Sequence, residues 1–283
     1  MDTYNSIQEI RKVISSIKSE GKTVAFVPTM GALHEGHLSL MRIAQKEADV
    51  VVVSIYVNPE QFGPNEDYDS YPRTLDSDLE KCRKEGVDLV FAPDDKIIYG
   101  SGNKYLNIGI SELNIHMDGG SRPGFFEGIL LVVNKLFNII KPDVAVFGQK
   151  DAQQYRILNQ MVDEFNHDVK MVMGPIVRAN DGLALSSRNA YLSDEERTIA
   201  PGLYRSLQYI IKQIQDGVKE PGLLLKHQIS ELEAKGFKND YLNVFVYQTM
   251  QPAETLKSGE KYILAGAAYL GKTRLIDNII FEI

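Results

Sequence analysis

The chain has 283 residues, 43% of them hydrophobic and 24% charged, which is enough for one large or two modest domains with their own cores. Its formal net charge of −7 excludes broad binding to a nucleic-acid backbone, which needs a basic face, but leaves small anions as ligands of a local cationic pocket. No apolar run reaches the roughly 18 residues of a membrane span, and the N-terminus MDTYNSIQEI lacks the basic and then apolar order of a secretory signal, so we expect a cytoplasmic protein without a membrane partner.

The first 176 residues alternate helical and strand-like patterns. Ser6 and Glu9 have capping-box spacing ahead of a helical stripe that stops at Gly21. The single cysteine, Cys82, lies in a later helical pattern, where we expect a buried thiol without a function. After the first helix, strands and helices are predicted in turn at residues 23–27, 36–47, 50–57, 74–86, 87–93, 126–140, 143–148, 151–165 and 169–172. This alternation predicts a Rossmann-like, doubly wound parallel sheet of the α/β class, in which ligands lie beyond the carboxyl ends of the strands.

The alternation ends near residue 176. Ser193 and Glu196 have capping spacing and predict one long helix through Ile214. A second helix, over residues 221–235, and three strands joined by turns, at 241–247, 261–270 and 273–279, are predicted after it. We therefore divide the chain into a first domain of residues 1–176 and a smaller α+β domain of residues 177–283.

The stretch VPTMGALHEGHLSL places His34 and His37 between the first strand of the predicted sheet and its helix. A helix N-terminus offers free amide donors and the positive end of a dipole, so imidazoles beside it suit phosphate oxygens. For this loop alone, a structural turn with solvated histidines remains an alternative. A metal site is a weaker alternative, because the spacing of the histidines is one residue shorter than in the metalloprotease motif.

Three further segments carry polar groups that would suit a nucleotide and a small substrate. Lys150 and Asp151, in the stretch FGQKDAQQY, lie at the same predicted edge of the sheet. Taken alone, Lys150 could be an ordinary surface lysine. VRANDGLALSSRN puts two hydroxyl groups and Arg188 in a loop that could close over a triphosphate or merely link the domains. VNPEQFG offers Asn58 and Gln61, which suit a polar organic substrate or form an ordinary asparagine-proline turn.

Together these segments resemble the pantoate–β-alanine ligase family, within the nucleotidyltransferase superfamily that carries a paired-histidine signature. The resemblance rests on an ordered set of motifs: PTMGALHEGH, VNPEQFG, YPRT, RPGFFEG, FGQKDAQQ, DGLALSSRN and TRLIDN. It implies that ATP drives the condensation of pantoate with β-alanine through a pantoyl adenylate, giving pantothenate, AMP and pyrophosphate. It further implies magnesium, a homodimer joined through the N-terminal domains, a nucleotide- and pantoate-binding role for residues 1–176 and a lid role for residues 177–283.

The same resemblance assigns roles to single residues. His37 is implied as the catalytic histidine, and Gln61 and Gln154 would hold pantoate, with Gln61 also near β-alanine. The residues implied to bind ATP are Met30, Gly31, Ala32, Leu33, His34, Glu35, Gly36, His37, Gly148, Gln149, Lys150, Asp151, Val177, Leu185, Ser186, Ser187 and Arg188.

The implied chemistry fits the residue types. Attack of the pantoate carboxylate on the α-phosphorus of ATP needs no protein nucleophile, and the amine of β-alanine then displaces AMP. The first step needs positive charge beside the phosphates, which we expect from His34, His37, Lys150, Arg188 and magnesium. Magnesium held through phosphate oxygens would also explain why the sequence shows no evident carboxylate cage, and we assign no residue to the metal.

Three positions depart from the usual family pattern. Phe125 stands where a histidine is usual, and it could alter the substrate pocket. Gln149 replaces a frequent glutamate and Leu185 a frequent methionine; a backbone contact at the first and an apolar contact at the second would survive these exchanges.

Two other functions compete with this interpretation. An adenylyltransferase that acts on a phosphorylated vitamin could use the same paired histidines, but it should lack the neutral groups around Gln61 and Gln154. A non-catalytic nucleotide sensor is a second alternative, which pantoate-dependent release of pyrophosphate would exclude.

The stretch GAAYLGKT, residues 266–273, has the spacing of a Walker A phosphate loop. Such a loop needs a strand before it and a helix after it, whereas only ten strand-like residues follow Thr273. We therefore predict a hairpin turn at Gly271 and Lys272.

Overall fold

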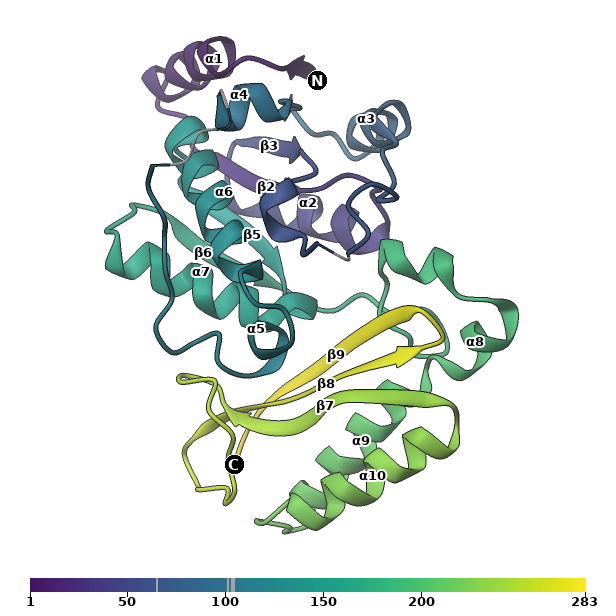
Figure 1. Cartoon of the computed structure of the whole chain (residues 1–283). Coiled ribbons are helices and arrows are strands. Elements are labelled where there is room, and N and C mark those ends of the chain that lie inside the picture. Colours follow the sequence, from purple (N-terminus) through teal and green to yellow (C-terminus); the bar gives the residue numbers. More distant parts are fainter. Residues whose placement is uncertain (65, 101, 103–104) are drawn as a thin grey trace. The chain divides into compact units, whose positions relative to one another are not determined.

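The computed structural model describes residues 1–64, 66–100, 102 and 105–283, which form two compact units (Figure 1). The first unit contains residues 1–110 and 123–175, and the second contains residues 111–122 and 176–283. Within the described residues, no helix is long and apolar enough to cross a membrane.

The first unit is built on a parallel sheet with the strand order β1-β4-β3-β2-β5-β6. Its strands are β1 (Asp2–Tyr4), β2 (Val24–Thr29), β3 (Val50–Ile55), β4 (Leu89–Phe91), β5 (Val144–Gly148) and β6 (Lys170–Gly174). Its helices are α1 (Ile7–Ser19), α2 (Glu35–Glu47), α3 (Leu75–Lys84), α4 (Asp95–Tyr99), α6 (Phe125–Ile140) and α7 (Ala152–Glu164), with the short 3₁₀ helices η1 (Pro59–Gln61) and η2 (Gln149–Asp151). The predicted Rossmann-like sheet is thereby confirmed.

Both faces of the central strand β2 are covered. Because side chains alternate along a strand, Val27 packs on one face with Met41 of α2, and Phe26 points to the other face, where its ring lies 6.4 Å from that of Phe137 of α6. The chain builds outward from β2 through β3 and β4 on one side and through β5 and β6 on the other. The order reverses between β2 and β5, the kind of position where open parallel sheets bind ligands.

The second unit pairs helices with an antiparallel sheet. Its strands are β7 (Phe237–Val246), β8 (Lys261–Leu270) and β9 (Thr273–Glu282), and its helices are α5 (Met117–Ser121), η3 (Ser187–Tyr191), α8 (Asp194–Ile199), α9 (Gly202–Gln215) and α10 (Gly222–Ala234). Leu207 and Ile210 of α9 are fully buried, in one core with the sheet residue Leu264. The smaller α+β architecture predicted for this part is confirmed.

The segment 111–122 is bound to the second unit through polar contacts of α5. Arg274 of β9 lies 2.6 Å from an oxygen of Asp118 and 2.7 Å from an oxygen of Asp240, and Ser121 donates a hydrogen bond to Asp240 at 2.9 Å. No pattern in the sequence predicts that this short segment joins the later half of the chain.

One predicted helix is wrong. The reciprocal capping box of Ser193 and Glu196 forms, but the helix that it begins ends at Ile199 and a new one starts at Gly202. Pro201 lies at this break. Proline has no backbone N–H and its ring clashes with the preceding turn of a helix, so the first helix cannot continue through it.

The hairpin prediction is confirmed. GAAYLGKT covers the end of β8, a turn and the first residue of β9, with Leu270 paired to Thr273 across the turn. These strands form the long yellow hairpin in Figure 1. Gly271 has the positive φ of 56° that a tight turn uses. A Walker A loop requires a helix after the glycine-lysine pair, whereas a strand follows here.

Cys82 is confirmed as buried, and burial raises the pKa of its thiol to about 12.

Candidate active site

The two histidines form a capping box at the start of α2. His34 is the N-cap residue, and its Nδ1 accepts a hydrogen bond from the backbone N–H of Gly36 at 3.1 Å. The Nδ1 of His37 in turn accepts from the backbone N–H of His34 at 3.3 Å, and the two ring centroids are 4.2 Å apart. The three-residue spacing in the sequence is thus the spacing of a reciprocal cap, made here by two imidazoles.

These hydrogen bonds determine where each ring carries its proton. A ring nitrogen that accepts a hydrogen bond has no proton, so in the neutral imidazoles of His34 and His37 the proton lies on Nε2. Both rings therefore present an Nε2–H donor on the side opposite the capping contact.

Both histidines are neutral at pH 7. Burial, together with the nearby charge of Lys150, lowers the pKa of His34 to about 4. Burial, the ring of His34 and the charge of Lys150 lower the pKa of His37 to about 3. With their pKa lowered, these histidines offer N–H donors in the neutral form, and Lys150 and Lys81 are the positive charges beside them.

Lys150 lies at the same edge of the sheet as the histidine loop. Gly148 ends β5, the neighbour of β2, and Gln149, Lys150 and Asp151 form η2 directly after it. The Lys150 ammonium is partly buried and lies 3.7 Å from Asp151. Its charge lowers the pKa of both histidines.

Lys81 is a cation that sequence reasoning missed. It comes from α3, and its Nζ donates a hydrogen bond to the backbone oxygen of Leu33 at 2.7 Å. Like Lys150, it lowers the pKa of His34 and of His37. No local signal distinguishes it from the other lysines and arginines of α3, because only the packing of that helix brings it to the loop.

The neutral polar groups predicted for a small substrate lie beside the same loop. Gln61 of η1 directs its amide nitrogen at the sulfur of Met30, 2.9 Å away. Asn58, only 1% exposed, donates to the amide oxygen of Gln61 at 3.1 Å and accepts from the hydroxyl of Tyr99 at 2.6 Å. Gln154 is half-buried in the first turn of α7, beyond the carboxyl end of β5.

Glu35 is the remaining predicted residue of this loop. It is exposed, and its carboxylate pairs with Arg42 one to two turns further along α2. Its side chain is thus directed along the helix surface, and a contact with a ligand at the helix start would come from its backbone N–H.

The other predicted ATP-binding residues belong to the second unit. The backbone N–H of Leu185 donates to the oxygen of Val177 at 2.9 Å, which closes a small hairpin. After it, Ser186 caps η3 and accepts from the backbone N–H of Arg188 at 3.3 Å. Ser187 and Arg188 are half-buried in the first turn of that helix.

The hairpin that carries this serine loop is anchored to the sheet of the second unit. Arg178 donates hydrogen bonds to both carboxyl oxygens of the buried Asp277 on β9, and its Nη2 lies 2.8 Å from Oδ1. Its guanidinium also lies 3.5 Å from the centre of the Tyr204 ring. An anchored hairpin can hold the serine loop that follows it in a defined position.

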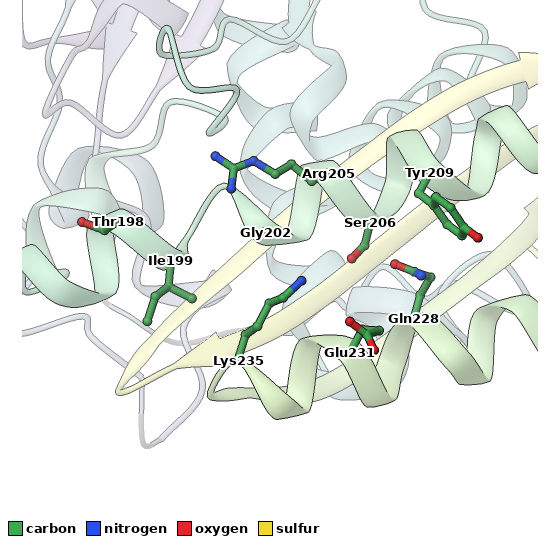
Figure 2. A pocket seen from close by; sticks show the side chains of 9 residues that line it. All are labelled: Thr198, Ile199, Gly202, Arg205, Ser206, Tyr209, Gln228, Glu231 and Lys235. Carbon is green, nitrogen blue, oxygen red and sulfur yellow. The ribbon is translucent and has the colours of Figure 1, made fainter.

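A pocket of about 520 Å³ lies elsewhere in the second unit, on α9 and α10 and the end of α8. Figure 2 shows the side chains of Ser206, Gln228 and Lys235 between the two longer helices. Its lining residues are Thr198, Ile199, Gly202, Arg205, Ser206, Tyr209, Gln228, Glu231 and Lys235, none of which the sequence assigns to the site.

Comparisons with known proteins agree with this geometry. The family model described as pantoate-beta-alanine ligase matches residues 2–280. A pantothenate synthetase of Pseudomonas fluorescens is 47% identical over 100% of this chain and 99% of its own, and one from Caldicellulosiruptor saccharolyticus is 46% identical over the full length of both.

Solved structures give the same result. Pantothenate synthetase from Thermus thermophilus has a TM-score of 0.88 at 38% identity over 99% of both chains. Pantoate-beta-alanine ligase from Francisella tularensis, complexed with "Beta-gamma ATP" and β-alanine, has a TM-score of 0.82 at 36% identity over 99% of this chain and 97% of its own. The family indicated by the ordered motifs is thus confirmed: this chain belongs to the pantoate–β-alanine ligases.

Proposed function

We propose that the chain carries out the family's ATP-dependent condensation of pantoate with β-alanine at the edge where β2 meets β5. The observation that carries this proposal is the pair of neutral histidines at the start of α2, whose Nε2–H groups face away from their own cap. Lys81 and Lys150 bring positive charge to the same place. This arrangement suits the phosphates of ATP, and the ATP-type ligand bound to the Francisella tularensis ligase supports it.

In the first step, the residues of the loop stabilise charge rather than form a covalent bond. The pantoate carboxylate, held by the amides of Gln61 and Gln154, attacks the α-phosphorus of ATP and expels pyrophosphate. Negative charge on the phosphate oxygens then meets the N–H donors of His34 and His37 and the Lys150 ammonium. Since burial and the charge of Lys150 lower the pKa of both imidazoles, each can donate this hydrogen bond in the neutral form.

In the second step, the amine of β-alanine attacks the acyl carbon of the pantoyl adenylate and AMP leaves. The mixed anhydride would react with water, so the site must exclude it. We assign this covering role to the second unit, whose serine loop, residues 185–188, together with Val177 completes the ATP site. Residues 1–176 are thereby proposed as the nucleotide- and pantoate-binding domain and residues 177–283 as the lid.

Magnesium would enter as part of the nucleotide substrate. It prefers oxygen ligands, whereas the groups gathered around the two histidines are N–H donors and ammonium groups. In the described residues, no group of three or more histidine, cysteine, aspartate or glutamate side chains could hold a metal ion. The N–H and ammonium groups present suit phosphate oxygens, so magnesium would be held through the phosphates of the nucleotide.

The resemblance also implies a homodimer, and the hydropathy and N-terminus of the sequence predict a cytoplasmic protein; both remain predictions. Sedimentation of the purified protein at micromolar concentration would test the first, with the mass of two chains as the expected result. Fractionation of the cells that produce the protein would test the second.

Isotope exchange between pyrophosphate and ATP tests the function. With β-alanine omitted, labelled pyrophosphate should enter ATP only when pantoate is present, and pantoyl adenylate should be recoverable from the protein. Exchange without pantoate, or the appearance of ADP and phosphate, would contradict the adenylate route and favour a sensor or an acyl phosphate.

The variant His37→Ala tests the site in the same assay. It removes one donor to the developing phosphate charge, so we expect exchange to fall about 10²-fold while the fold is retained. The exposed His227 of α10 provides the control, since His227→Ala should keep the normal rate. Normal exchange in folded His37→Ala would refute the assignment of the histidine.

A further inference from the structure

A buried aspartate of α3 has no role in the function proposed above. Asp78 is fully buried, with 0% of its surface exposed, although it belongs to a helix whose other carboxylates, at Asp76 and Glu80, are exposed. A buried carboxylate is costly unless several donors satisfy it, so its partners indicate what it does.

The partners of Asp78 are backbone groups of the histidine loop. One carboxyl oxygen accepts from the N–H of Leu33 at 2.8 Å, and the other accepts from the N–H of Ala32 at 2.9 Å. The hydroxyl of Thr74 donates to the second oxygen at 3.1 Å. Asp78 therefore holds two consecutive peptide groups that lie directly before His34.

The loop needs such an acceptor because of its backbone conformation. Gly31 and Ala32 have positive φ values of 81° and 48°, a conformation that an alanine rarely adopts without support from its surroundings. The loop also lies very close to the carboxylate, since a Cβ at Gly31 would be 3.0 Å from an oxygen of Asp78. Glycine permits this approach, and the two hydrogen bonds stabilise the turn that results.

Lys81, one turn further along α3, holds the opposite side of the same segment. Its ammonium donates to the backbone oxygen of Leu33 at 2.7 Å and lies 3.9 Å from the carboxylate of Asp78. Both backbone polar groups of Leu33 are thus bound by α3 side chains. The next residue, His34, is the N-cap whose own N–H binds the ring of His37, so its backbone position fixes both imidazoles.

We propose that Asp78 and Lys81 form a clamp that positions the two histidines for adenylate formation, an inference that rests on the proposed function. The clamp is formed by positioning residues: it contacts the loop and not the reacting atoms. It acts by keeping the two Nε2–H groups at hydrogen-bonding distance from the phosphate oxygens, where a shift of about 1 Å can cost about 10²-fold in rate.

The variant Asp78→Asn tests the clamp because it keeps the size of the side chain and replaces one acceptor with an amide donor. We expect pantoate-dependent pyrophosphate exchange to fall about 10²-fold. In a background that already carries His34→Ala and His37→Ala, the same substitution should cost less than about threefold, because there are no imidazoles left to misplace. Equal losses in both backgrounds would show a general structural role and overturn the proposal.

Asp76→Asn is the matched control, since Asp76 is exposed on the same helix, and it should keep the rate within about twofold. If Asp78→Asn does not fold, two variants of Lys81 replace it. Lys81→Gln and Lys81→Met both lose the charge, but only glutamine can still donate to Leu33, so we expect the methionine variant to be at least about fivefold slower. Equal rates for these two would overturn the clamp.

The same assay separates this inference from the proposed function. If the unaltered enzyme shows no pantoate-dependent exchange, the proposed function fails. If it shows exchange and Asp78→Asn matches it within about twofold, the function stands and the clamp alone is wrong.

Discussion

At the scale of single residues, two imidazoles have a structural role as a helix cap and, in the function that we propose, a chemical role as well. Each ring of the pair His34 and His37 uses Nδ1 to cap α2, which leaves Nε2–H for a ligand. The cap thereby selects the tautomer that phosphate binding needs, and burial keeps the rings neutral. A glutamate in place of His37 could accept the same capping hydrogen bond, but an ionised carboxylate would have no proton to donate to a ligand.

This arrangement predicts how stability depends on pH. The folded pKa values of about 4 for His34 and about 3 for His37 lie below the ordinary value of 6.5. Between pH 6.5 and these values the unfolded chain binds more protons than the folded protein does. The contribution of these histidines to the free energy of unfolding is therefore complete above pH 6.5 and is lost as the pH falls toward 4. We therefore expect the free energy of unfolding, measured with urea, to fall less between about pH 7 and about pH 5 in a His34→Gln, His37→Gln variant than in the natural sequence. An equal loss in the two proteins would contradict the neutral state of the histidines.

At the scale of elements, close contacts between short segments build the substrate side of the site. Gly128 in α6 allows this helix to approach η1, since a Cβ there would lie 1.9 Å from the backbone oxygen of Glu60. The oxygen of Gly128 also accepts a hydrogen bond from Asn58, which holds Gln61. The position of the Gln61 amide, which we propose binds pantoate, therefore depends on the packing of a helix that comes much later in the chain.

Gly128→Ala should separate these two elements. We expect a loss of about 1–3 kcal/mol in the free energy of unfolding from overpacking, and a higher KM for pantoate because Gln61 moves. Gly222→Ala is the control, since a Cβ at the start of α10 meets nothing within 4 Å and should not destabilise the protein. Urea unfolding and steady-state kinetics on both variants would check this, and an unchanged KM for pantoate in Gly128→Ala would contradict the link.

The hairpin of β8 and β9 allows a prediction at the same scale. Lys272 lies in its turn and is exposed, so Lys272→Ala should leave the KM for ATP within about twofold. Substrate titration of the purified variant measures this value. A large increase would mean that the turn binds phosphate despite its hairpin structure.

At the scale of the whole molecule, the residues that we propose for ATP binding belong to two units, and the chain passes from one unit to the other more than once, because residues 111–122 join the second unit. The serine loop is held within the second unit through the pair of Arg178 and Asp277. If the reaction needs this serine loop, removal of the Arg188 guanidinium should stop it, even though the histidine loop is intact.

Arg188→Ala tests that dependence. We expect adenylate formation to fall about 10²-fold, because the variant loses a donor that we propose contacts the phosphates. Arg205→Ala, a change of an exposed arginine in the pocket on α9 and α10, should leave the rate unchanged. Pyrophosphate exchange measures both variants, and the reverse outcome would move the site to that pocket.

The sequence by itself determined the main alternation of helices and strands in the first unit, the three strands of the second, the family and the edge of the sheet at which the histidine loop lies. Neighbouring residues carry these signals: the capping spacing of Ser193 and Glu196, the uninterrupted β-branched run of β3, and the glycine-lysine turn after β8. These signals lie within short segments of the chain, so they can be recognised without knowledge of the tertiary structure.

Only the tertiary structure decided the state of the site. The neutrality of His34 and His37 depends on burial and on lysines from α3 and η2, which the linear pattern does not relate to the loop. Asp78 gives one signal, a carboxylate on the same helix face as the buried Cys82, but its partners are backbone groups that lie far earlier in the chain. Burial and long-range hydrogen bonds arise only when distant segments pack together, and these decide which of the predicted groups carry charge and which residues hold them in place.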